Sequence, residues 1–190
     1  MQDKQRPNRI PYCERPKLEG DVHRLLDADL LQPDRSTWAS PIVLVRKKDG
    51  NVRMCADFRK LNLGTKKDCF PLPLLDETLD AVAGAKYFSS IDLLMGHHQV
   101  KLAPEDREKT AFLPDFGQFQ YRLMPFGYTT APATFQRLIS LVLQGQLGDI
   151  CLRYLADILI VATEFRDHVQ RLRLALDRLR EAGLKVKPSN

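Results

Sequence analysis

The sequence predicts an α+β fold, because segments with strand and helix patterns are mixed along the chain without the regular alternation of a doubly wound sheet. Two apolar runs rich in Ile, Leu and Val, at residues 150–154 and 157–162, predict an antiparallel pair joined by a tight turn. The stretch "KKDGN" carries an Asp-Gly pair, which is typical of a hairpin turn between strands at residues 42–46 and 52–57. Apolar residues at helical spacing over residues 165–182 predict an amphipathic helix.

The remaining elements follow from the same patterns in chain order. A loose polar arm, residues 1–16, precedes a helix over residues 18–30 that Pro33 stops. Gly148 and Gly183 are placed to end the two long C-terminal helices. The other predicted elements are helices at residues 74–83 and 132–147 and strands at residues 88–93, 98–102, 110–113 and 118–123.

The composition is that of a soluble globular protein with one domain, or one domain and a lobe: of its 190 residues, 44% are hydrophobic and 28% are charged. The apolar runs fall well short of the roughly 18 residues of a membrane span, and the polar start lacks a signal-peptide core. We therefore expect an intracellular protein, cytoplasmic or nuclear. A net charge of +5 leans towards polyanionic partners. The four cysteines form no C-x-x-C pair and no zinc-like spacing, which predicts free thiols.

Two aspartates stand where predicted strands meet turns. Asp157 opens the second apolar run, where a buried carboxylate needs a cation or a donor, and Asp92 follows an apolar strand start in "FSSIDLLMGHH". Two strands that each end in a carboxylate are what two-metal phosphoryl transfer requires, because Mg²⁺ takes oxygen ligands. A lone aspartate at a strand end, such as Asp92, is usually a turn or cap residue, whereas a buried aspartate in a hairpin turn, as expected for Asp157, is harder to explain in that way. Spacing does not show whether the strands are neighbours.

Basic side chains crowd the first predicted hairpin, in "RKKDGNVRMCADFRKLN". Lys47, Lys48 and Arg53 can project on one side of such a hairpin and grip phosphates, Arg53 through two parallel hydrogen bonds and the lysines as point charges. The alternative is a solvated charged hairpin, and composition alone favours it.

Six stretches follow one another along the chain: "WASPIVLVRKKDGNVRMCADFRKLN", "FPLPLLDETLDAVAGAKYFSSIDL", "TAF", "LMPFGYTTAPATFQRL", "YLADILI" and "LREAGLKVKPS". In order and spacing they resemble the reverse transcriptase of gypsy-like LTR retrotransposons, from about Pro11 to the last residue. The resemblance implies a right-hand polymerase without a thumb. Its fingers would be at about residues 1–67 and 102–130, and its palm, with an antiparallel sheet, at about 68–101 and 131–190. The implied activity is that of an RNA-directed DNA polymerase that binds an RNA or DNA primer–template, deoxynucleotide triphosphates and two Mg²⁺ ions.

The resemblance also implies roles for single residues. Asp92 and Asp157 match the catalytic, metal-binding aspartates, and Asp157 is the second aspartate of the Y-x-D-D box. The Leu93 carbonyl matches an additional metal ligand, and Lys185 or Lys187 lies where the family has a basic residue near the phosphates. The positions that match nucleotide-binding residues are Lys47, Arg53, Gly96, His97, Phe126 and Gly127.

The sequence departs from the family at two of these positions. Ala156 replaces the first aspartate of the Y-x-D-D box, a principal metal ligand in the family. A methyl group cannot coordinate Mg²⁺, and losing about 4 kcal/mol of transition-state stabilisation lowers a rate roughly a thousandfold. Asp149 and Glu164 lie too far along the predicted strands to replace the missing ligand. His97 stands where the family usually has a tyrosine, which lies under the sugar and helps to exclude ribonucleotides.

Two functions remain open from the sequence. The first is a polymerase domain whose activity is impaired by Ala156 or depends on a partner polymerase subunit. The second is a non-catalytic, retroelement-derived protein that binds nucleic acid or serves as a structural subunit, with an inactive truncated fragment as the limiting case.

Overall fold

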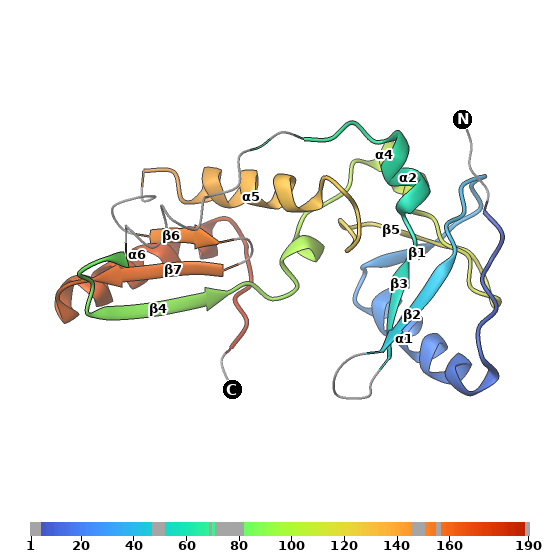
Figure 1. Cartoon of the computed structure of the whole chain (residues 1–190), viewed down its shortest axis with the longest axis horizontal. Helices are drawn as coiled ribbons and strands as arrows, with labels where there is room; N and C mark the ends of the chain where they lie inside the picture. The colour runs from blue at the N-terminus through green and yellow to red at the C-terminus, as the bar shows by residue number, and fades with distance from the viewer. Residues whose placement is uncertain are drawn as a thin grey trace. The chain divides into compact units, whose positions relative to one another are not determined.

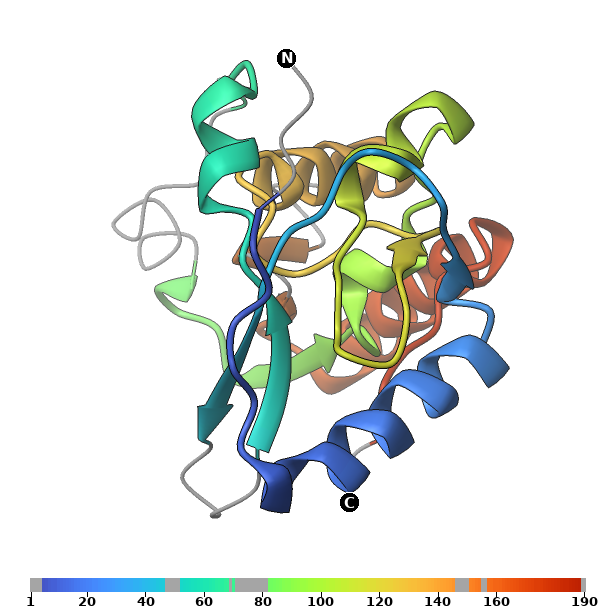
Figure 2. The same cartoon turned by 90° about the vertical axis from the view of Figure 1, so that its right-hand side faces the viewer.

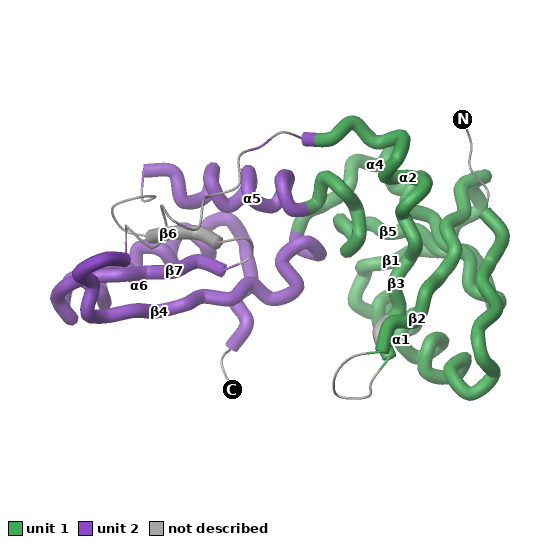
Figure 3. Tube along the Cα trace, viewed as in Figure 1, with its two compact units in different colours: residues 1–67, 100–131 green, residues 68–99, 132–190 purple. Residues whose placement is uncertain are grey.

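The contacts of the chain divide it into two units, which Figure 3 distinguishes by colour. The computed structural model describes residues 5–46, 52–68, 70, 82–145, 151–154 and 157–188. Unit 1 comprises residues 1–67 and 100–131, and unit 2 comprises residues 68–99 and 132–190. Helices and antiparallel strands are mixed in both units, which confirms the α+β class. That unit 1 corresponds to the fingers and unit 2 to the palm stays a prediction. Within the described residues, no helix has the length and apolar character that crossing a membrane requires.

Unit 1 carries two small antiparallel sheets beside one long helix. The predicted hairpin is confirmed: β2 (Ile42–Arg46) pairs with β3 (Val52–Ala56), and Figure 2 shows the two strands side by side. The second sheet pairs β1 (Leu31–Pro33) with β5 (Phe119–Tyr121). The helical elements are η1 (Tyr12–Glu14), α1 (Arg15–Asp27), α2 (Arg59–Gly64), α4 (Pro104–Arg107) and η3 (Glu108–Thr110).

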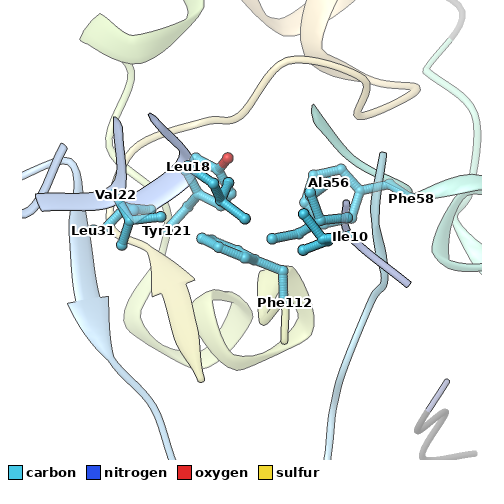
Figure 4. Close-up of a cluster of buried hydrophobic side chains, with 9 residues drawn as sticks. Ile10, Leu18, Val22, Leu31, Ala56, Phe58, Phe112 and Tyr121 are labelled. Atoms are coloured by element: carbon cyan, nitrogen blue, oxygen red, sulfur yellow. The ribbon is translucent and has the colours of Figure 1, made fainter. Parts of the chain in front are cut away.

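The core of unit 1 is a cluster of apolar side chains from segments far apart in the sequence. Figure 4 shows the Phe112 ring near the middle of this cluster, and its centroid lies 5.3 Å from that of Tyr121. Leu18 and Val22, four residues apart on α1, present one face of that helix to the cluster. The buried members are Ile10, Leu18, Val22, Leu31, Ile42, Ala56, Phe58, Phe112 and Tyr121.

Unit 2 is built on a three-stranded antiparallel sheet in the order β4-β7-β6. The central strand β7 (Asp157–Ala162) pairs with β4 (Tyr87–Asp92) on one side and with β6 (Cys151–Tyr154) on the other. The pair of β6 and β7 is the one that the two apolar runs predict. Helix α6 (Phe165–Glu181) packs on β7 and β4 and lies behind them in Figure 1. The other helical elements of the unit are η2 (Gly96–Gln99) and α5 (Ala131–Val142).

The end of α6 confirms the predicted glycine cap. Gly183 has a φ of 70°, its N–H donates to the Arg180 carbonyl, and the Leu184 N–H donates to the Leu179 carbonyl. This pair of bonds satisfies carbonyls at the helix end that have no partner inside the helix, and it requires the left-handed backbone that glycine adopts without strain.

Several predicted elements are wrong or differ at their ends. The helix α1 ends at Asp27, because Asp29 takes a left-handed φ of 58°, and Pro33 lies in a strand instead of stopping the helix. The predicted loose arm at residues 1–16 is wrong in part, because Ile10 is buried in the core. The strands predicted at residues 98–102 and 110–113 are replaced by the short helices η2 and η3 and by isolated bridges at Lys101 and Phe112. Most of residues 74–83 and Gly148 lie outside the described residues.

The turn η2 explains one of these errors. A Cβ atom on the buried Gly96 would lie 2.6 Å from Cζ of Phe135, whose side chain on α5 is itself fully buried. The His97 ring meets the same Phe135 ring edge-on, with centroids 5.4 Å apart. The chain turns here because a glycine lets α5 approach closely, and the local apolar pattern that predicts a strand does not report this packing.

Gly96→Ala should lower the free energy of unfolding by about 1–3 kcal/mol, because the new methyl group overpacks against Phe135. Urea denaturation measures this difference. Gly20→Ala on α1 is the matched control: nothing lies within 4 Å of the point that an added Cβ would occupy, so alanine should raise stability by up to about 1 kcal/mol. Equal stability of Gly96→Ala and wild type would mean that the contact with Phe135 is loose.

Stability should also fall as the pH falls from about 6.5 to about 4. Burial, and then the neighbouring His97, lowers the pKa of His98 from 6.5 to about 4. Between these values the unfolded chain binds a proton that the folded chain does not, so acid favours unfolding there. His98→Gln should reduce the slope of unfolding free energy against pH in that window by up to one proton, while above about pH 7 the two curves should run parallel. An unchanged slope in the variant contradicts the burial of His98.

Candidate active site

The two candidate aspartates lie directly opposite each other at the end of the β4–β7 ladder. The register pairs Asp92 of β4 with Asp157 of β7. The Asp92 carbonyl accepts a hydrogen bond of 2.8 Å from the Lys187 N–H, so the polar backbone groups of Asp92 point away from β7. Asp92 and Asp157 are therefore a non-hydrogen-bonded pair, the kind in which Cα atoms are roughly 4.5 Å apart and side chains lie closest. The two aspartates therefore occupy adjacent strands, which their spacing along the chain does not show.

Both carboxylates lie on the face of the sheet that α6 does not cover. Their neighbours Ile91 and Ile158 also form a register pair, and both are buried. On the same face as Ile91, Oγ of Ser89 shares a 2.8 Å hydrogen bond with Nε2 of His168 on α6. Because side chains alternate along a strand, Asp92 and Asp157 point to the opposite face. Asp157 is exposed, so the expectation of a buried carboxylate there is wrong. The Asp92 side chain is 48% exposed, so a ligand can reach both.

A cation near Asp92 and Asp157 would reduce the repulsion between their carboxylates. Two like charges directly opposite each other in a sheet destabilise it, and Nζ of Lys187 lies 3.4 Å from Oδ2 of Asp92. Carboxylate oxygens are hard ligands of the kind that Mg²⁺ takes. Within the described residues, no three Asp, Glu, His or Cys side chains gather to hold a metal. Among the described residues, the carboxylates of Asp92 and Asp157 are the side chains at this point that could hold a divalent ion.

Leu93, the predicted additional metal ligand, follows β4 and pairs with the C-terminal segment. Leu93 forms an antiparallel bridge with Val186, and the bonds of that bridge run from Lys187 N–H to Asp92 O and from Leu94 N–H to Lys185 O. In this arrangement the polar groups of Leu93 itself point to the other side, where β7 lies. The carbonyl is not used by the bridge with Val186. Ala156 lies outside the described residues.

The predicted phosphate contacts belong to unit 1, and their side chains lie beyond what the structure describes. Lys47 and Lys48 are outside the described residues, while Arg53 is described only as a backbone position of β3, opposite Val45. Their role in gripping phosphate stays a prediction.

The segment Phe126–Gly127 is held by a residue that the sequence reasoning missed. Nδ2 of Asn62 donates to the Gly127 carbonyl at 2.8 Å, and the Thr129 N–H donates to Oδ1 of Asn62 at 2.9 Å. Gly127 has a φ of 86°, which only glycine adopts readily. Phe126 is 48% exposed. The sequence held one signal for Asn62: an asparagine inside the short helix α2, where such a residue usually bonds to backbone elsewhere.

Gly96 and His97 lie in the same unit as Asp92, four and five residues further along the chain. The close approach of Phe135 leaves no room for a side chain at position 96, so packing alone accounts for the glycine there. Burial lowers the pKa of His97, so its ring is neutral at pH 7 and offers a flat surface without positive charge.

Comparisons with known proteins agree with this geometry. The family model described as reverse transcriptase (RNA-dependent DNA polymerase) matches residues 45–189. The retrovirus-related Pol polyproteins of the Drosophila melanogaster transposons opus and gypsy are 36% and 37% identical to this chain, over 93% and 89% of its length. The matches cover 18% and 17% of those polyproteins, so the chain spans less than a fifth of the length of these relatives.

Solved structures of known reverse transcriptases have a similar fold over nearly the whole chain. The foamy viral protease-reverse transcriptase in complex with an RNA/DNA hybrid is 26% identical, with a TM-score of 0.87 over 96% of this chain and 24% of that one. A second structure of that protein, in complex with double-stranded DNA, is also 26% identical with a TM-score of 0.87, over 96% of this chain and 32% of that one. The family model matches most of the sequence, the fold is shared with the foamy viral enzyme, and two aspartates of this chain lie opposite each other at the end of a sheet. The chain therefore belongs to the reverse transcriptase (RNA-dependent DNA polymerase) family, as a domain of the kind found in retrotransposon Pol polyproteins.

Proposed function

We propose that this chain is the fingers and palm of an RNA-directed DNA polymerase and that its catalysis is impaired because Ala156 brings no metal ligand. Unit 1 serves as fingers and unit 2 as palm. The observation that carries the polymerase assignment is the register pair of Asp92 and Asp157, since in-line phosphoryl transfer needs carboxylates from two strands at one point. The primer–template and the deoxynucleotide triphosphate are the proposed substrates.

Each candidate residue has a role in this proposal. Asp92, Asp157 and the Leu93 carbonyl hold Mg²⁺, which when bound offsets the negative charge of the reacting phosphates. Lys47 and Arg53 contact the triphosphate, and the Asn62-bound segment of Phe126 and Gly127 borders the base. The proposed nucleotide-binding residues also include Gly96 and His97, whose neutral ring takes the position of the family's tyrosine under the sugar.

The impairment follows from counting anionic ligands. Two carboxylates hold two divalent ions less well than three, because each anionic ligand lowers the repulsion between the ions and helps to keep both of them beside the reacting phosphates. Asp92 and Asp157 suffice to attract a cation, so we expect metal binding to survive in weakened form while the chemical step slows.

Wild-type protein should show little or no nucleotide incorporation on a primed RNA template with Mg²⁺, and Ala156→Asp should raise it. A restored carboxylate that recovers about 4 kcal/mol of stabilisation raises the rate roughly a thousandfold, provided that the rest of the site is intact. Single-nucleotide primer extension measures the rate. Ala156→Asn is the matched control, because it has nearly the size of aspartate without the charge and should not restore activity.

Asp92→Asn tests the same proposal from the other side. It should abolish whatever activity Ala156→Asp restores. Robust incorporation by the wild-type protein that Asp92→Asn abolishes would instead show that two carboxylates suffice, and the proposed impairment would be wrong.

A second candidate function is nucleic-acid binding without catalysis. The net charge of +5 and the cluster of only two acidic side chains at the end of the described sheet favour it. The solved relatives that carry an RNA/DNA hybrid or double-stranded DNA support nucleic acid as the partner class. This function does not depend on Ala156, because lysine and arginine contact phosphates without a metal.

Binding of a primer–template should be micromolar or weaker and should fall steeply with salt, by about 0.9 in log K per log salt for each phosphate neutralised. Replacing both Lys47 and Arg53 by glutamine should make this slope shallower, in proportion to the number of phosphates that these two side chains neutralise. Fluorescence anisotropy at several salt concentrations measures the slope. Arg178→Gln with Arg180→Gln, on the exposed side of α6, removes the same charge and should change the slope less. Binding that is independent of salt, or equal slopes for the two double variants, argues against the hairpin as a phosphate contact.

A further inference from the structure

The C-terminal segment of residues 185–187 continues the sheet of unit 2 beyond the end of β4. Figure 1 shows the chain after α6 returning past the end of that strand. The bridge between Leu93 and Val186 places Lys187 opposite Asp92 and Lys185 opposite Leu94. Residues opposite one another in an antiparallel ladder share a face. Asp157, Asp92 and Lys187 therefore form a row across three neighbouring segments, on one face of the sheet.

The side chain of Gln99 fixes this segment in place. Its Nε2 donates to the Leu94 carbonyl at 2.7 Å and to the Lys185 carbonyl at 3.0 Å, and its Oε1 accepts from the Lys185 N–H at 2.6 Å. One amide thus joins the chain after Asp92 to the chain before Lys187, across 86 residues of sequence. The backbone bond from Lys187 N–H to Asp92 O, 2.8 Å long, completes the attachment.

The attachment brings a positive charge to a metal-site carboxylate. Nζ of Lys187 lies 3.4 Å from Oδ2 of Asp92, and both side chains remain about half exposed. An ammonium group at this distance offsets the repulsion between Asp92 and Asp157 without any metal. A divalent ion that binds Asp92 must share that carboxylate with Lys187 or displace its ammonium group.

We propose that Lys187 is a resident counter-cation of Asp92, held there by the Gln99-bound segment, and that Lys187 and a divalent ion compete for the Asp92 carboxylate. The competition depends on one part of the proposed function, namely that Asp92 binds a divalent metal ion. The ion pair itself does not.

The test measures Mn²⁺ binding to the whole chain without nucleic acid, by electron paramagnetic resonance of the free ion. Lys187→Gln should raise Mn²⁺ affinity roughly two- to fivefold more than Lys185→Gln does, which is the range that half-exposed ion pairs reach. Lys185→Gln is the matched control, since it removes the same charge from the same segment without facing Asp92. Asp92→Asn should remove the difference between the two variants.

Equal affinities of Lys187→Gln and Lys185→Gln, with Mn²⁺ bound in both, overturn the competition and leave the proposed metal site standing. If no variant binds Mn²⁺, the proposed metal site fails and the competition with it. A double-mutant cycle between Asp92→Asn and Lys187→Gln, in urea unfolding at low salt without metal, then decides the ion pair. A coupling of roughly two- to fivefold in the unfolding constant supports the counter-cation, and no coupling overturns it.

Discussion

The pairing of Asp92 with Asp157 is the constraint on which the rest of unit 2 depends. Two carboxylates at opposed, non-hydrogen-bonded positions repel each other unless a cation lies nearby, so the sheet must be stabilised by other contacts. Those contacts lie on the opposite face. Ile91, Ile158 and Ile160 are buried there, and α6 packs over them with Ala175 and Leu179 fully buried. The apolar face stabilises a register that the charged face opposes.

The register also has little freedom to change. Sliding β4 by one residue against β7 would turn Asp92 towards α6 and Ile91 towards solvent, because side chains alternate along a strand. The hydrogen bond between Ser89 and His168 adds a polar contact that holds only in the observed register. A buried histidine facing a serine on this face is best understood as part of the scaffold that fixes where the two aspartates meet.

Sequence patterns predict those parts of the fold that each segment determines by itself. The β2–β3 hairpin, the pair β6–β7 and the helix α6 follow from turn residues and apolar periodicity, and their bounds agree within a few residues. The strands predicted at residues 98–102 and 110–113 are wrong because packing from elsewhere decides them, as Phe135 does for Gly96. Asp92 and Asp157 are found by resemblance, since spacing along the chain does not show that two strands are neighbours. Asn62 and Gln99 are missed because a side chain that bonds to backbone 65 or 86 residues away leaves no periodic signal.

The charges along the row of Asp157, Asp92 and Lys187 connect the altered motif to the C-terminal segment. Two carboxylates and one ammonium group leave a local formal charge of −1, whereas an aspartate at position 156 would bring it to −2. A metal site gains affinity from each uncompensated negative charge, and the unliganded fold loses stability from the same charges. In the proposed metal site, Ala156 and Lys187 therefore act in the same direction: each lowers the negative charge that the unliganded fold must tolerate, and each weakens the proposed binding of a metal. Restoring the carboxylate alone leaves the ammonium group beside Asp92, so under the proposed competition full metal affinity also requires that Lys187 moves away from Asp92.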